Sequence, residues 1–395
     1  MHLAFCEKVW YNTNKEKDRS ERRLGFYAKH RWFRVIIGII SGIIIIVLIA
    51  IAFMRIFPAF GGRPTKAERK NYSQRAGYYD GRRFNYPDEW SIEGIGQDVR
   101  VSSKGTAPKD ELPVKFPEID EDTDINDVRV TWFGHSSVLI QMHGMNILVD
   151  PVFSQRSSPV QWIGPKRFTV PSVSAADLPH IDVLLISHDH HDHLDTDTIK
   201  EIDSKVDRYI VPLGIENHLE RWGVSPDKIL NKAWWESETV NGLEITCAPG
   251  RHFSGRSLID QNYTQWCSWV LMDEYHQIFE NGDGGFGGHF EEIHDRFGDF
   301  DLVMLDCAQY DANWHYSHMY PEESAMAAEI LGAKVVMPIH WGAFILSSHG
   351  WDDPPERFTI AAEQRGLNIV TPYLCETMDP DAPDKYQERW WRNYE

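Results

Sequence analysis

Cysteine is scarce in this sequence. The five cysteines among 395 residues (Cys6, Cys247, Cys267, Cys307 and Cys375) show no paired spacing. Their scatter excludes a disulfide-stapled scaffold and predicts at most one disulfide. A repeat with a period of about 20–50 residues is also lacking, which excludes a solenoid.

Basic residues are in short supply over most of the chain. Residues 1–75 carry 15 Lys and Arg against 5 Asp and Glu, whereas residues 76–395 carry 25 against 54. An acidic body repels phosphate backbones, so the composition excludes a role in binding nucleic acid. The basic amino-terminal end needs another explanation.

Charge is absent altogether from residues 35–54, which are mostly Ile and Val. A helix of this length covers the hydrocarbon core of a bilayer, about 30 Å. A buried core helix is rarely apolar on every face, and a signal sequence rarely has so many residues ahead of its apolar run. We therefore predict a transmembrane helix over residues 35–54, preceded by a basic segment over residues 1–34.

The flanking charges predict an orientation. Nine Lys and Arg precede the apolar run, and six lie between residues 55 and 75. The positive-inside rule then places the amino terminus in the cytoplasm and the large domain outside it. The sequence predicts a single-pass membrane protein with an extracytoplasmic domain.

Regular structure is expected after a polar stretch. Residues 55–127 are punctuated by Gly and Pro and predict a linker and an extended entry segment. Residues 128–395 predict one domain, in which strands first come in hairpins and then alternate with helices, as in a mixed α/β fold. The predicted strands are residues 128–133, 137–142, 145–149, 180–186, 208–212, 243–248, 267–273, 277–281, 301–306, 334–339 and 367–371, and the predicted helices are residues 195–204, 215–222, 321–331 and 355–365.

A histidine-rich motif follows the strand predicted at residues 180–186, which is nearly continuously apolar. In His188-Asp-His-His-Asp-His193, His188 and His190 can aim two imidazoles at one metal ion. Asp192 and His193 can aim a carboxylate and an imidazole at a second one. Asp189 and His191 fill the positions between and are interpreted as bystanders.

Further ligands are expected at the ends of later strands, because one motif does not saturate two metals. His252 follows residues 243–248, Asp283 follows residues 277–281, and His340 follows residues 334–339. A single His after a strand is more often an ordinary hydrogen-bonded residue. The shared position of all three favours ligation.

Several stretches carry a resemblance to a known family. They are Thr131-Trp-Phe-Gly-His-Ser-Ser137, Asn146-Ile-Leu-Val-Asp-Pro-Val-Phe-Ser154, Ser158-Pro159, Gly164-Pro-Lys-Arg167, Ser187-His-Asp-His-His-Asp-His-Leu-Asp195, Pro249-Gly-Arg-His-Phe-Ser-Gly-Arg256, Gly282-Asp-Gly-Gly-Phe286, His318 with Pro321, and Ile339-His-Trp-Gly-Ala-Phe344. Together they resemble the metallo-β-lactamase superfamily, in the branch that contains N-acyl-phosphatidylethanolamine phospholipase D and the L-ascorbate-6-phosphate lactonases. Residues 78–85 also resemble the entry segment of bacterial members.

The resemblance implies an αββα sandwich with two metal ions at one edge. It implies that His188, His190 and His252 hold one zinc, that Asp192, His193 and His340 hold the other, and that Asp283 bridges them. Imidazole and oxygen ligands without thiolate suit zinc, and manganese or iron are alternatives.

Two such metals lower the pKa of a shared water and so supply a nucleophile near neutral pH. The predicted catalytic residues are Asp283, Asp192 and His318, with His318 binding phosphate or protonating a leaving group. Asp150 is predicted to orient a ligand histidine or, alternatively, to cap a turn. Predicted substrate contacts are Tyr310, Trp314 and Arg256.

The predicted function is a phospholipase D-type hydrolysis of N-acyl-phosphatidylethanolamine-like lipids, because an anchor places the domain beside a bilayer. The predicted partners are a membrane lipid substrate and the bilayer, and a homo-oligomer is left open. One alternative is a lactonase or esterase acting on a small, phosphorylated carbonyl substrate. Another is a non-catalytic membrane regulatory module, against which the complete ligand set argues.

Overall fold

The computed structural model describes residues 2–92, 94, 104–119 and 124–395. The chain divides into two compact units, Met1–Phe57 and Pro58–Glu395. The acidic run at residues 118–124 lies partly outside the described residues.

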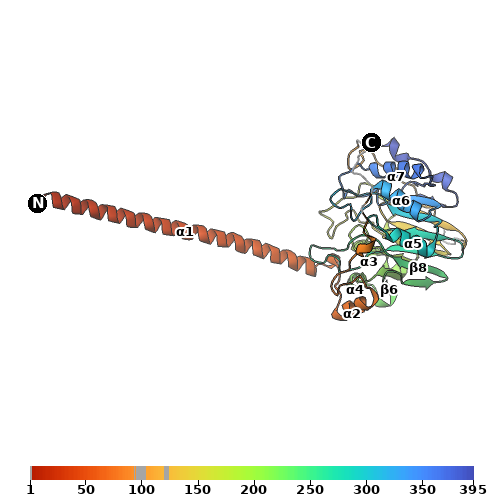
Figure 1. The fold of residues 1–395 in the computed structure, drawn as a ribbon, viewed down its shortest axis with the longest axis horizontal. Coiled ribbons are helices and arrows are strands. Elements are labelled where there is room, and N and C mark those ends of the chain that lie inside the picture. The colour runs from red at the N-terminus through yellow and green to blue at the C-terminus, as the bar shows by residue number, and fades with distance from the viewer. Residues whose placement is uncertain (1, 93, 95–103, 120–123) are drawn as a thin grey trace. The chain divides into compact units, whose positions relative to one another are not determined.

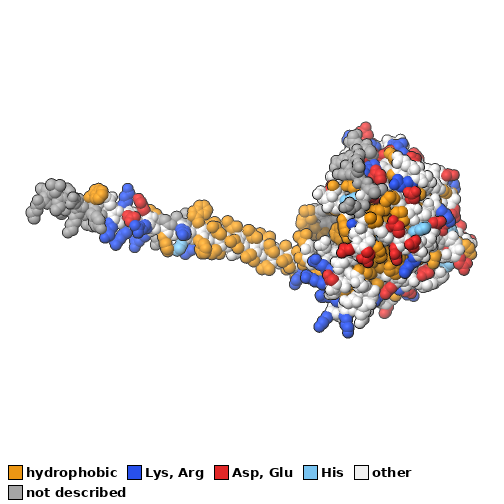
Figure 2. All heavy atoms as spheres, viewed as in Figure 1, with side chains coloured by type: hydrophobic (Ala, Val, Ile, Leu, Met, Phe, Trp, Pro, Cys, Tyr) orange, Lys and Arg blue, Asp and Glu red, His pale blue; other side chains and the backbone are white. Residues whose placement is uncertain are grey.

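The first unit is a single long helix, α1 (His2–Ile56). Within the described residues, its part Trp32–Ile56 is the one helical stretch long and apolar enough to cross a membrane, with a mean hydropathy of 3.3. Figure 2 shows its hydrophobic side chains as a continuous band, with Lys and Arg side chains on the amino-terminal side. The predicted apolar helix is therefore present, and its insertion in a membrane stays a prediction.

The second unit contains two mixed sheets. The first has the order β13-β1-β2-β3-β4-β5-β6, and the second has the order β12-β11-β10-β9-β8-β7. The strands are β1 (Val128–Trp132), β2 (Val138–Met142), β3 (Met145–Val149), β4 (Ile181–Leu185), β5 (Val206–Pro212), β6 (Ile229–Lys232), β7 (Ser237–Val240), β8 (Leu243–Ala248), β9 (Ser268–Met272), β10 (Gln277–Glu280), β11 (Leu302–Asp306), β12 (Val335–Ile339) and β13 (Thr377–Met378).

Both faces of the first sheet are buried. Successive side chains of a strand point to opposite faces, so neighbouring residues pack into different hydrophobic clusters. On β4, Val183 packs in one hydrophobic cluster with Ile245 of the second sheet. Its neighbour Leu184 packs in another cluster with Ile199 of α3. The core thus lies between the sheets, and a second apolar layer lies under the helices.

Helices cover the outer faces and complete an αββα sandwich, as predicted. Side chains of α3 (Thr196–Ile202) and α4 (Glu216–Trp222) pack on the first sheet. Side chains of α5 (His289–Phe297), α6 (Pro321–Ile330) and α7 (Asp353–Gln364) join the other cluster. Figure 1 shows α5, α6 and α7 side by side along one face.

The predicted linker contributes to this core. It contains α2 (Lys66–Arg75), which has a Thr65 capping box. Tyr72, Tyr79 and Phe84 are buried in the cluster between the sheets. The compact unit therefore begins at Pro58, ahead of the predicted domain start at residue 128, because an aromatic-rich entry segment packs against it.

The structure differs from the predicted elements in a few places. The predicted strand at residues 367–371 forms a single parallel bridge to β12, from Ile369 to Val336. The short strands β6 and β7 and the helices α2 and α5 were not predicted. The two strands lack a clear apolar alternation, whereas α5 carries Phe290, Ile293 and Phe297 at helical spacing and was overlooked because it is short. The four cysteines whose side chains are described are buried and free, in agreement with the prediction of few disulfides.

Candidate metal centre

The loop after β4 holds the histidine motif. β4 pairs in parallel with β3 and β5, and β10 pairs in parallel with β11 and β11 with β12, so their carboxyl ends meet along one edge of the sandwich. Polar side chains after buried strands are therefore brought together there. Asp195 ends the loop as the amino-terminal cap of α3 and accepts a bond from the backbone of Asp197.

The first group of ligand atoms comes from the loops after β4, β8 and β10. The Nε2 atom of His188 lies 2.8 Å from Nδ1 of His190, which lies 3.2 Å from Nε2 of His252. The Asp283 Oδ2 atom lies 3.8 Å from Nε2 of both His188 and His252. Four ligand atoms thus converge within the span of one coordination sphere.

The second group is adjacent and shares Asp283. The Oδ2 atom of Asp283 is 3.1 Å from Nε2 of His193, and its Oδ1 atom is 2.9 Å from Nδ1 of His340. Asp192 Oδ2 lies 3.7 Å from Nε2 of His193. The structure therefore brings the seven residues predicted as ligands into two groups joined by the Asp283 carboxylate, and their ligation of metal stays a prediction.

The residues fit a pair of divalent metals. The Nε2 atom of His340 is buried without a hydrogen-bond partner among the described residues, a costly arrangement unless an ion binds there. The donors are imidazoles and carboxylates without thiolate, which suits zinc and also manganese or iron. The groups support divalent metal binding and leave the identity of the metal open.

Asp283 reaches both groups because glycines surround it. Gly282 has φ of +58°, and a Cβ atom there would lie 2.5 Å from Cβ of Ser187. Burial disfavours ionisation of Asp283, but the charges of His193 and His340 hold its pKa well below its usual range. The carboxylate is thus ionised where metal ligation requires it.

Asp150 orients a ligand histidine. Its Oδ2 atom is 2.7 Å from Nδ1 of His193, and its Oδ1 atom accepts a bond from the backbone N–H of Ser187. The structure shows the contact that the predicted orienting role requires, and the chain also turns at this residue, which has φ of +43°. This bond fixes the ring so that Nε2 faces the second group.

His318 faces the space between the two groups. Its ring centroid lies 5.1 Å from that of His252 and 5.3 Å from that of His340. Its Nδ1 atom is 3.0 Å from Asp306 Oδ2, at the end of β11. Burial opposes protonation of His318, but the hydrogen bond and charge of Asp306 outweigh it and raise its pKa.

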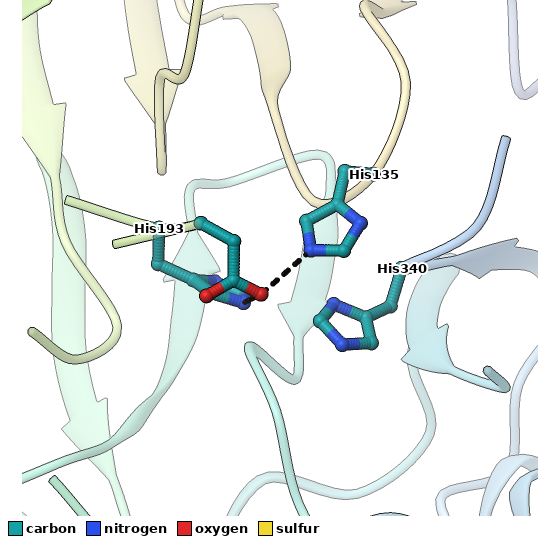
Figure 3. A group of neighbouring side chains, drawn as sticks. His135, His193 and His340 are labelled. Carbon is teal, nitrogen blue, oxygen red and sulfur yellow. Dashed lines mark hydrogen bonds and ion pairs between the residues drawn. The ribbon is translucent and has the colours of Figure 1, made fainter. Parts of the chain in front are cut away.

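His135 belongs to this centre and was not predicted as a site residue. Its Nε2 atom is 2.9 Å from Asp192 Oδ2. Figure 3 shows His135, His193 and His340 pointing toward one another, with the dashed line marking the His135 bond. Burial lowers the pKa of His135 to about 3, so the neutral ring donates its N–H to Asp192.

Backbone geometry also ties His135 to the site. His135 and His340 have φ of +55° and +69°, an uncommon conformation that recurs at functional sites. The backbone of His340 donates to the carbonyl of His135, and the backbone of His135 donates to the carbonyl of Trp341. The sequence signal that could have identified His135 is its position in Gly134-His-Ser136, shortly after the buried strand β1.

Comparison with known proteins agrees with this geometry. Residues 145–341 match the family model described as the beta-lactamase superfamily domain. An uncharacterised protein of Mycobacterium tuberculosis is 35% identical over 85% of this chain and 92% of its own length. The N-acyl-phosphatidylethanolamine-hydrolyzing phospholipase D 1 of Caenorhabditis elegans is 31% identical over 62% of this chain and 74% of its own length.

The chain belongs to the metallo-β-lactamase superfamily. With its two ligand groups it is a metal-dependent hydrolase of that superfamily. Its homologues also include the mitochondrial N-acyl-phosphatidylethanolamine-hydrolyzing phospholipase D of Saccharomyces cerevisiae, 35% identical over 60% of this chain and 52% of that protein. The metallo-hydrolase Igni18 of Ignicoccus hospitalis shares the fold, with a TM-score of 0.50 and 19% identity over 64% of this chain and 97% of its own.

In this metallo-β-lactamase-fold chain, the two residues interpreted as bystanders hold the ligand loop in place. Asp189 accepts bonds from His218, Thr264 and the backbone of Gly255. His191 Nδ1 is 3.0 Å from the Arg256 guanidinium. These contacts attach the loop to neighbouring segments.

The three predicted substrate contacts lie in different surroundings. Arg256 is buried and donates to the carbonyls of Ala59, Asp189 and Leu194. Tyr310 is buried and donates its hydroxyl to Asp353. Trp314 is partly exposed, and its ring N–H donates to the Gln309 carbonyl. The hydrogen bonds of Arg256 and Tyr310 therefore hold neighbouring segments together. Substrate contact by any of the three residues stays a prediction.

A cavity of about 530 Å³ opens beside the first ligand group. Asn85, Tyr86 and Asp88 of the entry segment form one wall, and residues from 252 to 316 form the rest. The lining residues are Asn85, Tyr86, Asp88, His252, Phe253, Gln261, Asn262, Trp266 and Tyr316. The entry segment therefore shapes the approach to the metal centre, which the sequence did not indicate.

Proposed function

We propose that this chain is a phospholipase D-type phosphodiesterase acting on N-acyl-phosphatidylethanolamine-like lipids. The similarity to the nematode and yeast phospholipases carries the proposal, because two distantly related organisms supply relatives with one reaction in their names. Two further features support it. The two ligand groups share Asp283 and can hold two metal ions, and His318, paired with Asp306, can act as an acid.

Metal ions held by the two groups would supply an acidified water as nucleophile and polarise a phosphoryl oxygen. Asp283, which belongs to both groups, orients the site around the phosphorus. The water oxygen forms a bond to phosphorus, and the bond between phosphorus and the hydroxyl oxygen of the N-acylethanolamine breaks. The products are an N-acylethanolamine and a phosphatidic acid.

His318 is the proposed general acid for the departing alcohol. Asp306 engages its Nδ1 atom, which leaves Nε2 as the proton donor. The same pairing raises the pKa of His318 and so favours the protonated form that an acid requires. The proton moves from His318 to the alkoxide oxygen as the P–O bond breaks.

We further propose that Trp32–Ile56 anchors the chain in a bilayer. Its length and hydropathy support a single crossing. The charge balance on its two sides supports a cytoplasmic amino terminus and an extracytoplasmic hydrolase domain. The anchor would keep the enzyme at a surface where its lipid substrate is concentrated.

A lactonase or esterase on a small carbonyl compound is the second candidate. The cavity beside His252 favours it, because Asn85, Asp88, Gln261 and Asn262 give that cavity a polar lining. The same nucleophile would attack a carbonyl carbon, and the ring or ester C–O bond would break.

The test is release of N-acylethanolamine from N-acyl-phosphatidylethanolamine in mixed micelles by the purified full chain. Metal content is determined on the same sample. Turnover with about two metals per chain supports the phospholipase. If the protein binds two metals and hydrolyses only a lactone, the second candidate is favoured. If it binds two metals and catalyses neither reaction, the hypothesis of a non-catalytic regulatory module is favoured.

A further inference from the structure

A second cavity lies on the other side of the entry segment. Its volume is about 550 Å³, and none of the seven predicted ligands lines it. It shares Asn85 and Tyr86 with the cavity at the metal centre. Its lining is Gly77, Tyr78, Tyr79, Asp80, Asn85, Tyr86, Pro87, Glu89, Trp90, Trp234 and Trp235, which we call the aromatic cavity.

Aromatic rings build its walls. The rings of Tyr78 and Trp234 stack with centroids 4.0 Å apart, and the Trp90 ring lies 6.1 Å from that of Trp234. Trp234 is held by a bond from its ring N–H to the carbonyl of Trp266, 2.6 Å long, and its backbone N–H donates to the Tyr78 hydroxyl. The rings are thus fixed in place by packing and hydrogen bonds.

The charges of this lining have one sign. Asp80 and Glu89 are its ionisable carboxylates, and the described lining residues include no Lys, Arg or His. The Arg296 guanidinium lies outside the lining, against the ring of Trp235. The pKa of Asp80 lies below its ordinary value because the backbone N–H groups of Arg83 and Arg82 donate to it. Aromatic faces beside carboxylates attract a cation.

Trp235 adds a ring that the backbone holds in a fixed position. It has φ of +73°, which a bulky residue adopts rarely and which occurs here in the turn between β6 and β7. Its backbone N–H donates to the carbonyl of Cys247, which holds this conformation. The Arg296 guanidinium lies 4.2 Å from the centre of its ring, so one face of Trp235 already receives a cation.

We propose that the aromatic cavity binds an organic ammonium ion, with a trimethylammonium group as the best match. Such a group presents methyl surface to the rings and a diffuse positive charge to Asp80 and Glu89. An acyl chain fits less well, because the described lining residues offer no aliphatic side chain apart from Pro87, and burying Asp80 and Glu89 under it would be costly. This inference does not depend on the proposed phospholipase activity.

The test compares choline with its neutral isostere 3,3-dimethylbutan-1-ol, by ligand-observed NMR on the full chain in dodecyl maltoside. We expect choline to bind about tenfold more tightly or better, because only choline carries the charge. Glu89→Gln and Trp90→Leu should each weaken choline binding several-fold. Trp162→Leu is the matched control, because Trp162 is 76% exposed and lies outside this lining.

Equal affinity for the two probes, or choline binding that Glu89→Gln leaves unchanged, would overturn the proposal. Glu89 is exposed, so its variant avoids the folding defect that Trp90→Leu risks. Dihexanoylphosphatidylcholine identifies the source of the ammonium group. Tighter binding than choline assigns the cavity to a lipid headgroup, and equal binding assigns it to a free ammonium compound.

Discussion

Asp283 is the residue on which both ligand groups depend. Its two carboxylate oxygens lie between 2.9 and 3.8 Å from four histidines that belong to the two groups. A change at this position therefore removes a ligand from each metal at once.

We expect Asp283→Ala to lose bound metal and to lower turnover by at least about 100-fold, more than the loss of an outer partner costs. Metal analysis and kinetics on one sample check this. Asp207→Ala is the matched control, because Asp207 is an exposed carboxylate beside another histidine, His180. Full activity in Asp283→Ala would contradict the two-metal assignment.

His318 makes a prediction about pH. A general acid works while protonated, so activity falls as the pH rises through its pKa. Because Asp306 raises that pKa, Asp306→Asn should move the alkaline limb of the kcat profile to lower pH. His318→Gln should lower kcat by about 10²–10⁴-fold and abolish that limb.

The control for this profile is His315→Gln. His315 is also paired with a carboxylate, since its Nε2 atom is 2.6 Å from Glu323. An unchanged alkaline limb in Asp306→Asn would remove His318 from the proposed role. A limb that moves in His315→Gln as well would point to a general effect of charge.

Asp150 tests the orienting bond to His193. Asn tolerates the left-handed conformation of this position, so Asp150→Asn removes the charge and preserves the turn. We expect metal affinity to fall about 10–100-fold, measured by competition with a chelator. Unchanged affinity together with a lowered unfolding temperature would reduce Asp150 to a structural role.

At the scale of elements, the entry segment is an integral layer of the domain. Phe84 is fully buried, and its ring lies 4.6 Å from that of Tyr79 and 5.8 Å from that of Tyr72. Tyr72 in turn donates its hydroxyl to Glu216 at the start of α4. These contacts attach residues far apart in sequence to one core.

We expect Phe84→Ala to lower the free energy of unfolding by about 3–5 kcal/mol, because it leaves a cavity in packed surroundings. Denaturant unfolding of the full chain, followed by near-ultraviolet circular dichroism, measures this. Phe116→Ala serves as the control, because Phe116 is 79% exposed and should tolerate the change. Equal effects of the two substitutions would mean that the segment packs loosely.

At the scale of the whole molecule, the apolar helix and the hydrolase domain are separate units. Removal of residues 1–57 should move the protein from the membrane fraction to the soluble fraction. Hydrolysis of a water-soluble, short-chain phosphodiester should persist, because the metal ligands all lie in the second unit. Persistent membrane association of the shortened chain would show that another surface also binds lipid.

Local sequence was sufficient for much of the fold. The strand before the histidine motif is apolar except for Asp182, and the helix after it begins at an Asp cap. Short-range patterns of this kind reflect the period of a strand or a helix, so they are readable from a single chain. The short strand β7 was missed because pairing with β8 stabilises it, whereas α2 was missed although Thr65 and Glu68 form a capping box that is readable from the sequence.

The sequence alone determined the apolar helix and the ligands after buried strands, because both depend on neighbouring residues. Only the tertiary structure decided that His135 contacts Asp192 across a separation of 57 residues. It also decided that Arg256 binds backbone carbonyls and that the entry segment lines the approach to the centre. Such contacts join side chains whose positions are set by the packing of two sheets, and no local pattern encodes that packing.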